Sequence, residues 1–203
     1  MTVYHHGNLR QSLLDNSLQL LRAEGSEALS LRRLAELTGV SRAAPYHHFK
    51  DKQALLAAVA AQGFAELAAL LQQLVSDEQI ALELRLQQAV LGYLDFAQAQ
   101  PALYQLMFGQ TLWPADSPTH GNSVSTTQFQ RAAKDCFRQY VHLFERLQAA
   151  GQLASSNALR SAQLLWATLH GLATLTRDGA FFTRDDLAEI AAHALAQFAR
   201  APA

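Results

Sequence analysis

The sequence predicts an all-α protein, on three observations. Alanine and leucine dominate a chain of 203 residues that is 50% hydrophobic, and both residues favour helices. Apolar residues recur at three- and four-residue spacing along most of the chain, which is the period of an amphipathic helix. Glycine and proline are few, 10 and 5. We therefore expect about nine helices, in a chain long enough for one or two domains with a real core.

Charge is divided unevenly along the chain. Residues 1–55 carry seven basic and five acidic side chains, whereas the remainder carries nine basic and twelve acidic ones. A positive N-terminal part is expected if only that part meets nucleic acid. The single cysteine, Cys136, excludes an internal disulfide and is consistent with a reducing compartment. No signal segment opens the chain and no run of about 18 apolar residues occurs, so we expect a cytoplasmic protein without a membrane anchor.

The first two helices have clear ends. Residues 1–7 are interpreted as an arm, and Asn8 can cap a first helix that stops at Gly25. Ser30 can cap a second helix, which ends at Thr38-Gly39. The buried face of this second helix is expected to consist of Leu31, Leu34, Ala35 and Leu37.

A tight turn and a third helix follow, with Ser41 as the expected cap. Two helices that cross at about 90–120° through a short turn need a small side chain at the crossing and a residue that tolerates positive φ, which Ala35 and Gly39 supply. A helix that enters the major groove reads base edges with its N-terminal residues, and short side chains there let the backbone approach. Pro45 would be the fourth helical residue, where its missing N–H favours a short third helix.

The stretch 30–52 concentrates side chains that suit a phosphate backbone. They are Arg32, Arg33, Ser41, Arg42, Tyr46, His47, His48, Lys50 and Lys52. A solvated, charged helical hairpin is the simpler interpretation of most basic helices, but the capped turn favours DNA binding here. A metal site at His47-His48 is not expected, because adjacent helical residues point about 100° apart whereas a shared metal needs i, i+4 spacing.

The order of residues from Leu31 to Leu56, LRRLAELTGVSRAAPYHHFKDKQALL, resembles the DNA-binding domain of the TetR/AcrR family of transcriptional repressors. The resemblance covers about a quarter of the chain, and Pro45 stands where many members have leucine. It implies a homodimer, an N-terminal three-helix helix-turn-helix domain (1–55) and a C-terminal helical ligand-binding and dimerisation domain (56–203). By this resemblance the residues that face the major groove are Ser41, Arg42, Ala43, Ala44 and His47, and those that hold phosphates are Ser30, Arg32, Tyr46, His48 and Lys52.

The remaining helices are predicted from apolar periodicity and breakers. Asp51 can cap a long fourth helix that stops at the polar break Ser76-Asp77-Glu78. A long loop is expected over 109–124, which contains two prolines and two glycines. The later helices are expected at 80–99, from Pro101, and at 126–150, 157–178 and 184–200.

The helix at 157–178 is apolar on most of its sides, which in a small domain implies a partner chain. We expect the last two helices, about 157–200, to pair with their copies in a four-helix bundle. Within them the segment WATLHGL, with Trp166, His170 and Gly171, resembles a Trp–His–Gly motif that marks one C-terminal subgroup of the same family.

A regulatory pocket is expected from the family's fold and from the supply of aromatic residues. Most of these residues taken singly are more simply explained as core, and His170 beside Trp166 is the one histidine carried as a pocket donor. Few charged groups fall among them, so the expected effector is an apolar or aromatic small molecule. The candidate ligand-binding residues are Tyr93, Phe96, Tyr104, Met107, Phe108, Trp113, Phe137, Tyr140, Trp166 and His170.

No enzyme, cofactor or metal is predicted. The sequence contains no Gly-rich phosphate loop, no His-Glu-x-x-His and no Gly-x-Ser-x-Gly, and Cys136 lies on an apolar helical face as a core residue would. The expected function is a repressor that binds a palindromic double-stranded DNA operator as a dimer and is released by the effector. Two alternatives stay open: a helical ligand- or protein-sensing module without DNA binding, and a transcriptional activator.

Overall fold

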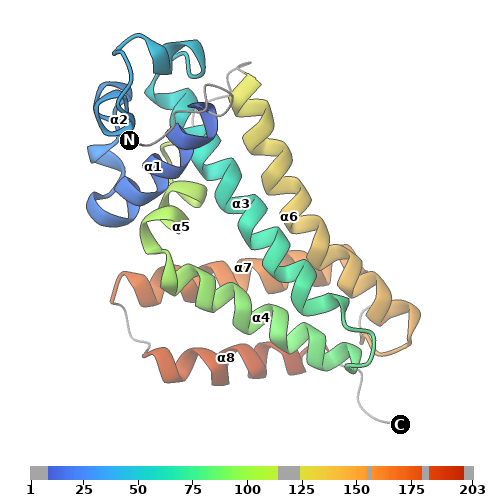
Figure 1. The fold of residues 1–203 in the computed structure, drawn as a ribbon. Helices are drawn as coiled ribbons and strands as arrows, with labels where there is room; N and C mark the ends of the chain where they lie inside the picture. Colours follow the sequence, from blue (N-terminus) through green and yellow to red (C-terminus); the bar gives the residue numbers. More distant parts are fainter. Residues whose placement is uncertain (1–8, 114–123, 155–156, 180–182, 199–203) are drawn as a thin grey trace. The chain divides into compact units, whose positions relative to one another are not determined.

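The protein is all-α, as its sequence predicts. The computed structural model describes residues 9–113, 124–154, 157–179 and 183–198 (Figure 1). Within these ranges it has no β-strand, and two 3-10 helices, η2 (Ser26–Ala28) and η3 (Ala44–His47), accompany the α-helices. The α-helices are α1 (Leu9–Glu24), α2 (Leu31–Thr38), α3 (Lys52–Ser76), α4 (Leu82–Ala99), α5 (Pro101–Phe108), α6 (Val124–Ala149), α7 (Ala158–Arg177) and α8 (Arg184–Ala196).

The chain forms two compact units, each made of two segments. The first unit contains residues 1–64 and 102–133, and the second contains 65–101 and 134–203. Helices α3, α5 and α6 contribute to both units. This division follows packing contacts, whereas the boundary expected after residue 55 separates functions, and that boundary stays a prediction.

The first unit holds the N-terminal helices around an apolar core. Helix α1 packs on α2, and α2 packs on η3. One polar tie joins the first pair, in which the Asn16 amide donates to the Thr38 hydroxyl over 3.0 Å. The fully buried side chains of this unit include Leu13, Leu21, Leu34, Ala35, Phe49 and Leu55. The predicted small residue Ala35 is indeed buried at this packing, whereas Leu37, predicted on the same face, is 55% exposed.

The second unit is built on helices α4, α7 and α8, each of which packs on the other two (Figure 1). Tyr93 and Tyr140 meet in its core with ring centroids 6.3 Å apart, and the Tyr140 hydroxyl donates to the Ala89 carbonyl over 3.3 Å. Cys136 is buried here, as predicted for a core cysteine. Burial raises the pKa of its thiol to about 12, which keeps the thiol protonated and unreactive at neutral pH.

Helix α3 bears on the expectation that the chain has no membrane segment. It is long and apolar enough to cross a membrane by length and composition, with a mean hydropathy of 1.8 over its most apolar window. Gln62 and Glu66 interrupt its apolar run, but the mean hydropathy of the window stays high enough for a membrane span. However, 67% of the window is buried inside the protein. A core helix passes the same test, so the observation is weak evidence for a membrane span.

The predicted helix ends are confirmed at several caps. The Ala54 N–H donates to the Asp51 carboxylate over 2.7 Å at the start of α3, and Asn157 caps α7 by accepting from the Arg160 N–H over 3.0 Å. Gly25 follows α1 with a positive φ of 81°, but its ψ of 177° is extended rather than left-handed helical. The predicted cap Asn8, the arm at 1–7 and most of the 109–124 loop lie outside the described residues.

Candidate DNA interface and effector site

Helix α2 is fixed at both ends by the groups that its sequence supplies. At its start, the Ser30 hydroxyl accepts from the Arg33 N–H over 3.2 Å. At its end, Gly39 adopts the left-handed conformation (φ 71°, ψ 31°) and donates to the Glu36 carbonyl, while Val40 donates to the Ala35 carbonyl over 3.0 Å. These two bonds form a Schellman motif, which satisfies the last carbonyls and sets the direction of the turn.

The segment after the turn is not the α-helix that the sequence predicted. Residues 44–47 form the 3-10 helix η3, and the turn before it has the same spacing, since Ala44 donates to the Ser41 carbonyl over 3.0 Å. The residue that precedes η3 is Ala43, and no side chain caps this helix, so the predicted cap at Ser41 is wrong. Pro45 explains the difference, because it has no N–H to donate to the Ser41 carbonyl.

Pro45 also anchors the segment. It is buried, and its carbonyl accepts from the Phe49 N–H over 2.9 Å. Phe49 is itself buried, and the Arg10 guanidinium lies over its ring at 5.4 Å from the centroid. The recognition segment is therefore a short, tethered turn, in which buried Pro45 and Phe49 flank exposed Tyr46, His47 and His48.

All ten candidate DNA-binding residues lie between Ser30, the cap of α2, and Lys52, the first residue of α3, and His48 directly follows η3. Tyr46 is 57% exposed, the largest exposed fraction among the described large apolar side chains of the first unit. The exposed members are Arg32, Ser41, Arg42, Ala43, Tyr46, His47 and His48, and the half-buried ones are Ser30, Ala44 and Lys52. The segment thus presents hydroxyl, imidazole and guanidinium groups together, which is what phosphate and base-edge contacts require.

Glu36 is a part of this surface that the sequence analysis did not select. Its carboxylate lies 3.4 Å from the Arg32 guanidinium and 4.0 Å from that of Arg42, and all three side chains are more than half exposed. The i, i+4 spacing of Arg32 and Glu36 is the feature of the sequence that could have identified Glu36. Because both arginines are candidate DNA contacts, Glu36 competes with phosphate for them.

Lys52 occupies an unusual position for a lysine. It is the first residue of the 25-residue helix α3, where the helix dipole disfavours a positive charge and favours an anion. Its ammonium donates to the Glu27 carbonyl over 3.5 Å. A phosphate group beside Lys52 would meet both the lysine charge and the N-terminal end of the helix.

The ten candidate ligand residues are divided between the two units. Tyr104, Met107, Phe108 and Trp113 belong to the first unit, and the other six belong to the second. In the first unit the Tyr104 and Phe108 rings are 4.7 Å apart, and the Trp113 indole donates to the Met107 carbonyl over 2.7 Å. Phe64 and Phe129, which were not predicted, complete this aromatic cluster at 5.1 Å from Phe108 and 4.8 Å from Trp113.

In the second unit an aromatic row runs from α6 onto α7. Phe137 lies 5.6 Å from Trp166, which stacks on His170 at 6.2 Å with 28° between the rings. Burial lowers the pKa of His170, and the positive charge of Arg177 lowers it further. One turn later on the same face, the buried Thr174 hydroxyl has no hydrogen-bond partner among the described residues. Thr174 is a candidate ligand-binding residue that a search for aromatic residues could not identify.

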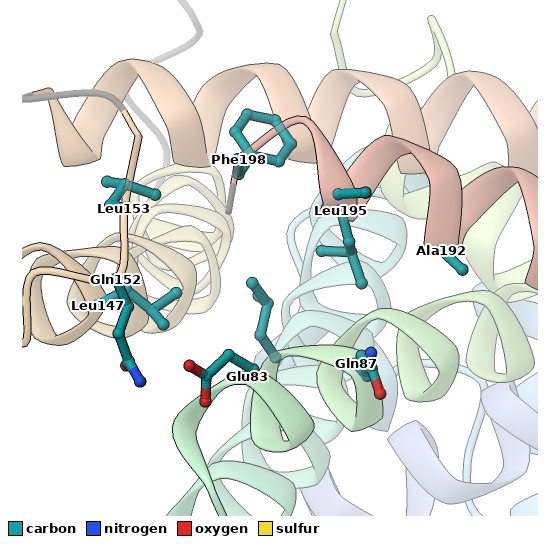
Figure 2. Close-up of a pocket in the computed structure, with 10 residues that line it drawn as sticks. Glu83, Gln87, Leu147, Gln152, Leu153, Ala192, Leu195 and Phe198 are labelled. Atoms are coloured by element: carbon teal, nitrogen blue, oxygen red, sulfur yellow. The ribbon is translucent and has the colours of Figure 1, made fainter. Parts of the chain in front are cut away.

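A separate pocket lies among α4, α8 and the residues that follow α6 (Figure 2). None of the ten candidate ligand residues lines it. Within the described ranges there is also no group of three or more histidine, cysteine, aspartate or glutamate side chains that could hold a metal ion.

Comparison with known proteins gives the family. Residues 13–59 match the sequence profile described as bacterial regulatory proteins, tetR family. Residues 86–198, more than half of the chain, match the profile described as tetracyclin repressor-like, C-terminal domain. The chain belongs to the TetR family. It is therefore an all-α member of this family of bacterial regulatory proteins, and the second profile spans Trp166, His170 and Gly171.

Individual relatives of this TetR-family regulator match mainly at the N-terminus. The repressor AcnR of Corynebacterium efficiens is 41% identical over 61 residues, which are 30% of this chain and 32% of AcnR. The chain thus matches about a third of the length of that relative. A longer match, 32% identity over 132 residues, covers 62% of this chain and 67% of the nucleoid occlusion factor SlmA of Marinobacter nauticus. A solved Rhodococcus protein of unknown function is similar over 98% of this chain and 100% of its own, with 33% identity and a TM-score of 0.82.

Proposed function

We propose that this TetR-family regulator is a cytoplasmic repressor that binds a palindromic operator as a homodimer and is released by a small apolar or aromatic effector. One observation carries the DNA-binding part of the proposal. A helix capped at both ends leads through a Schellman turn into an exposed segment of arginine, tyrosine and histidine side chains. Two copies of this segment would enter successive major grooves, about 34–36 Å apart.

Roles within the segment follow from position and chemistry. Ser41, Arg42, Ala43, Ala44 and His47 are proposed to face base edges, and Arg42 is the member that can make a bidentate contact with guanine. Ser30, Arg32, Tyr46, His48 and Lys52 are proposed to hold phosphates. Phosphate contacts fix the register of the protein on DNA, and base contacts select the sequence.

The effector part rests on the row Phe137, Trp166 and His170 with Thr174 beside it. Burial favours the neutral form of His170, so its ring can donate from one nitrogen and accept at the other. The unused Thr174 hydroxyl adds a second polar group to a mainly aromatic surface. An effector that prefers a conformer with weaker DNA affinity would release the operator, and DNA would weaken effector binding by the same factor.

The DNA roles are tested by selecting bound duplexes from a random pool and measuring their affinity at several salt concentrations. Tyr46→Phe and Lys52→Ala should weaken all selected sequences together, and Lys52→Ala should lower the salt slope by about one. Arg42→Ala should instead change which sequences are selected, at a cost of about 1–3 kcal/mol. Arg138→Ala removes a charge from an exposed site on α6 and serves as the control.

Failure of the wild-type protein to shift any duplex would favour the rival interpretation, a sensing module that does not bind DNA. A uniform loss of affinity in Arg42→Ala would contradict its base-reading role. Unchanged affinity and salt slope in Tyr46→Phe and Lys52→Ala would contradict the phosphate assignments. Whether the protein represses or activates is decided by placing the selected operator before a reporter gene, and increased transcription would favour the activator.

A further inference from the structure

The pocket of the second unit has a size and a lining that suit a small molecule (Figure 2). Its volume is about 150 Å³, and most of its wall is aliphatic or aromatic, including Leu86, Leu195 and Phe198. An apolar cavity of that volume can hold a benzene-sized molecule. The Phe137–Trp166–His170 row contributes no residue to it, so it is a second site and not a part of the proposed effector surface.

The walls of the pocket are held in place by backbone bonds. Helix α6 ends in a Schellman motif in which Gly151 (φ 70°) donates to the Gln148 carbonyl and Gln152 donates to the Leu147 carbonyl, both over 3.0 Å. The Ala154 N–H then donates to the Phe198 carbonyl over 2.9 Å, which ties the end of α8 to this connection. The Phe198 ring is packed edge-on against Phe144 at 5.4 Å. The pocket is therefore formed before any ligand arrives, which lowers the entropic cost of binding.

Two polar groups of the lining define what the ligand must offer. The side-chain oxygen of Gln152 is buried and has no hydrogen-bond partner among the residues that the structure describes, although buried acceptors are almost always paired. Glu83, in the first turn of α4, brings a negative charge to the rim. Figure 2 draws Glu83 and Gln152 on the same side of the pocket, with Leu195 and Phe198 on the opposite side.

No described residue of the lining neutralises that charge. The lining residues given by the described part of the chain include no lysine, arginine or histidine, and Arg146, near the end of α6, lies 3.8 Å from Glu78. A carboxylate and an unused carbonyl oxygen both call for a donor, and a cationic donor satisfies the two at once. An anionic or purely acceptor ligand would leave the Gln152 oxygen unpaired and would meet repulsion at Glu83.

We propose that this pocket binds a small organic cation, a primary ammonium group carried on a compact aromatic or aliphatic body. The ammonium donates to the Gln152 side-chain oxygen and to the Glu83 carboxylate. The apolar body lies against Leu86, Leu195 and Phe198. The site requires neither DNA binding nor the effector surface, so it stands apart from the proposed function.

The test compares two probes of equal size on the full-length protein without DNA. 2-Phenylethylammonium chloride should bind about ten-fold more tightly at low salt than neutral 2-phenylethanol, because only the ammonium gains charge-assisted hydrogen bonds. The dissociation constants are measured by NMR titration, with the side-chain amide of Gln87, which also lines the pocket and is kept in every variant, as the reporter. Glu83→Gln should bring the amine down to the level of the alcohol, and Gln152→Met should weaken the amine about five-fold.

Glu145→Gln is the matched control, since it makes the same charge change on an exposed residue of α6 that is outside the pocket lining. It should leave both dissociation constants unchanged. The proposal is overturned if the amine and the alcohol bind equally, if neither binds, or if Glu83→Gln and Glu145→Gln have equal effects. Amine binding that weakens as the protein is concentrated would assign the pocket to contact between copies, and would also overturn it.

Discussion

Glu36 lies on the proposed DNA surface with its carboxylate beside two arginines, at 3.4 Å from Arg32 and 4.0 Å from Arg42. Exposed pairs of this kind contribute little to stability, about 0–1 kcal/mol. Their effect on DNA binding is larger in principle, because a carboxylate repels phosphate and holds both guanidinium groups. An anionic residue at such a position lowers non-specific affinity for DNA.

We predict that Glu36→Gln raises the affinity for any duplex by about three- to ten-fold at low salt, since one repulsive charge is removed and two arginines are released. Fluorescence anisotropy with a random duplex measures the change, and the gain should shrink as salt rises. Glu145→Gln, the same change in the other unit, should have no effect. Equal or weaker affinity in Glu36→Gln would contradict the placement of Arg32 and Arg42 at the DNA.

The lowered pKa of His170 predicts how the stability of the protein depends on pH. Its pKa is lowered in the folded protein by burial and by Arg177, so between the folded and unfolded pKa values the unfolded chain binds more protons. Stability from this residue is present above the unfolded pKa of about 6.5 and is lost as pH falls through the folded value. His170→Gln should therefore show a smaller fall in Tm between about pH 7.5 and 5.5 than the wild type.

The control for this measurement is His193→Gln, at an exposed position of α8. It should keep the wild-type difference in Tm between the two pH values. If His170→Gln also keeps the full difference, the burial of the His170 imidazole does not govern its protonation.

At the scale of the element, α2 depends on the residue that follows it. Gly39 has φ 71° and ψ 31° and supplies one of the two bonds that close the helix. We predict that Gly39→Ala destabilises the protein by about 1–2 kcal/mol, because a side chain disfavours the left-handed conformation. Urea unfolding measures the loss.

Gly171→Ala provides the opposite case. Gly171 lies inside α7 with no heavy atom within 4 Å of an added Cβ, so alanine should be neutral or stabilising by up to about 1 kcal/mol. If the two substitutions change stability alike, the left-handed geometry at Gly39 does not control the end of α2.

Helix ends that are set by a single nearby residue were predictable from the sequence. Those at which two residues favour different structures were not. Ser30, Gly39 and Asp51 act within four residues of themselves, and the structure has each in its expected role. Ser41 was expected to cap for the same reason, but Pro45 four residues later changed the hydrogen-bond spacing. The periodicity of Leu37 suited a buried face, yet no element covers it within the described structure, where it is 55% exposed.

Sites made by distant segments left weaker traces in the sequence. The aromatic residues were identified as a set, but their division between two units depends on packing that composition does not encode. Glu83 and Gln152 are 69 positions apart and line one pocket because α4 and the residues that follow α6 belong to the same unit. Thr174 and Gln152 became candidates because their oxygens are buried without partners in the described part of the chain, a property that exists only in the folded chain.

At the scale of the whole molecule, α7 carries an apolar face that no other described residue covers. Leu164 and Leu175 are 60% and 42% exposed, although leucines of a regular helix are usually more buried. They lie about 20° apart around the helix and so share one face, whereas Leu159, which is 45% exposed, lies on the other side. This exposure supports the proposed homodimer through the last two helices, with Leu164 and Leu175 at the centre of its interface.

We predict that Leu164→Glu weakens the dimer on the order of 100-fold, because a carboxylate would be buried without a partner. Sedimentation velocity over a range of concentrations measures the dissociation constant. Leu84→Glu changes a leucine of similar exposure, 50%, on α4, and should leave the dimer intact. A wild-type monomer, or equal effects of the two variants, would contradict pairing through α7.

The 3-10 geometry around Pro45 also limits how much sequence information one copy can read. The proposed base-facing residues, from Ser41 to the end of η3 at His47, extend about 14 Å, roughly four base-pair steps, so a pair of half-sites specifies on the order of sixteen bits. A sequence of that information content recurs by chance within roughly 65,000 base pairs, which is too often for a genome with about a million or more competing sites. The spacing between the two half-sites must then provide much of the specificity for the operator. Operators of this protein should tolerate a substituted base better than an inserted one, which rotates one half-site by about a tenth of a turn.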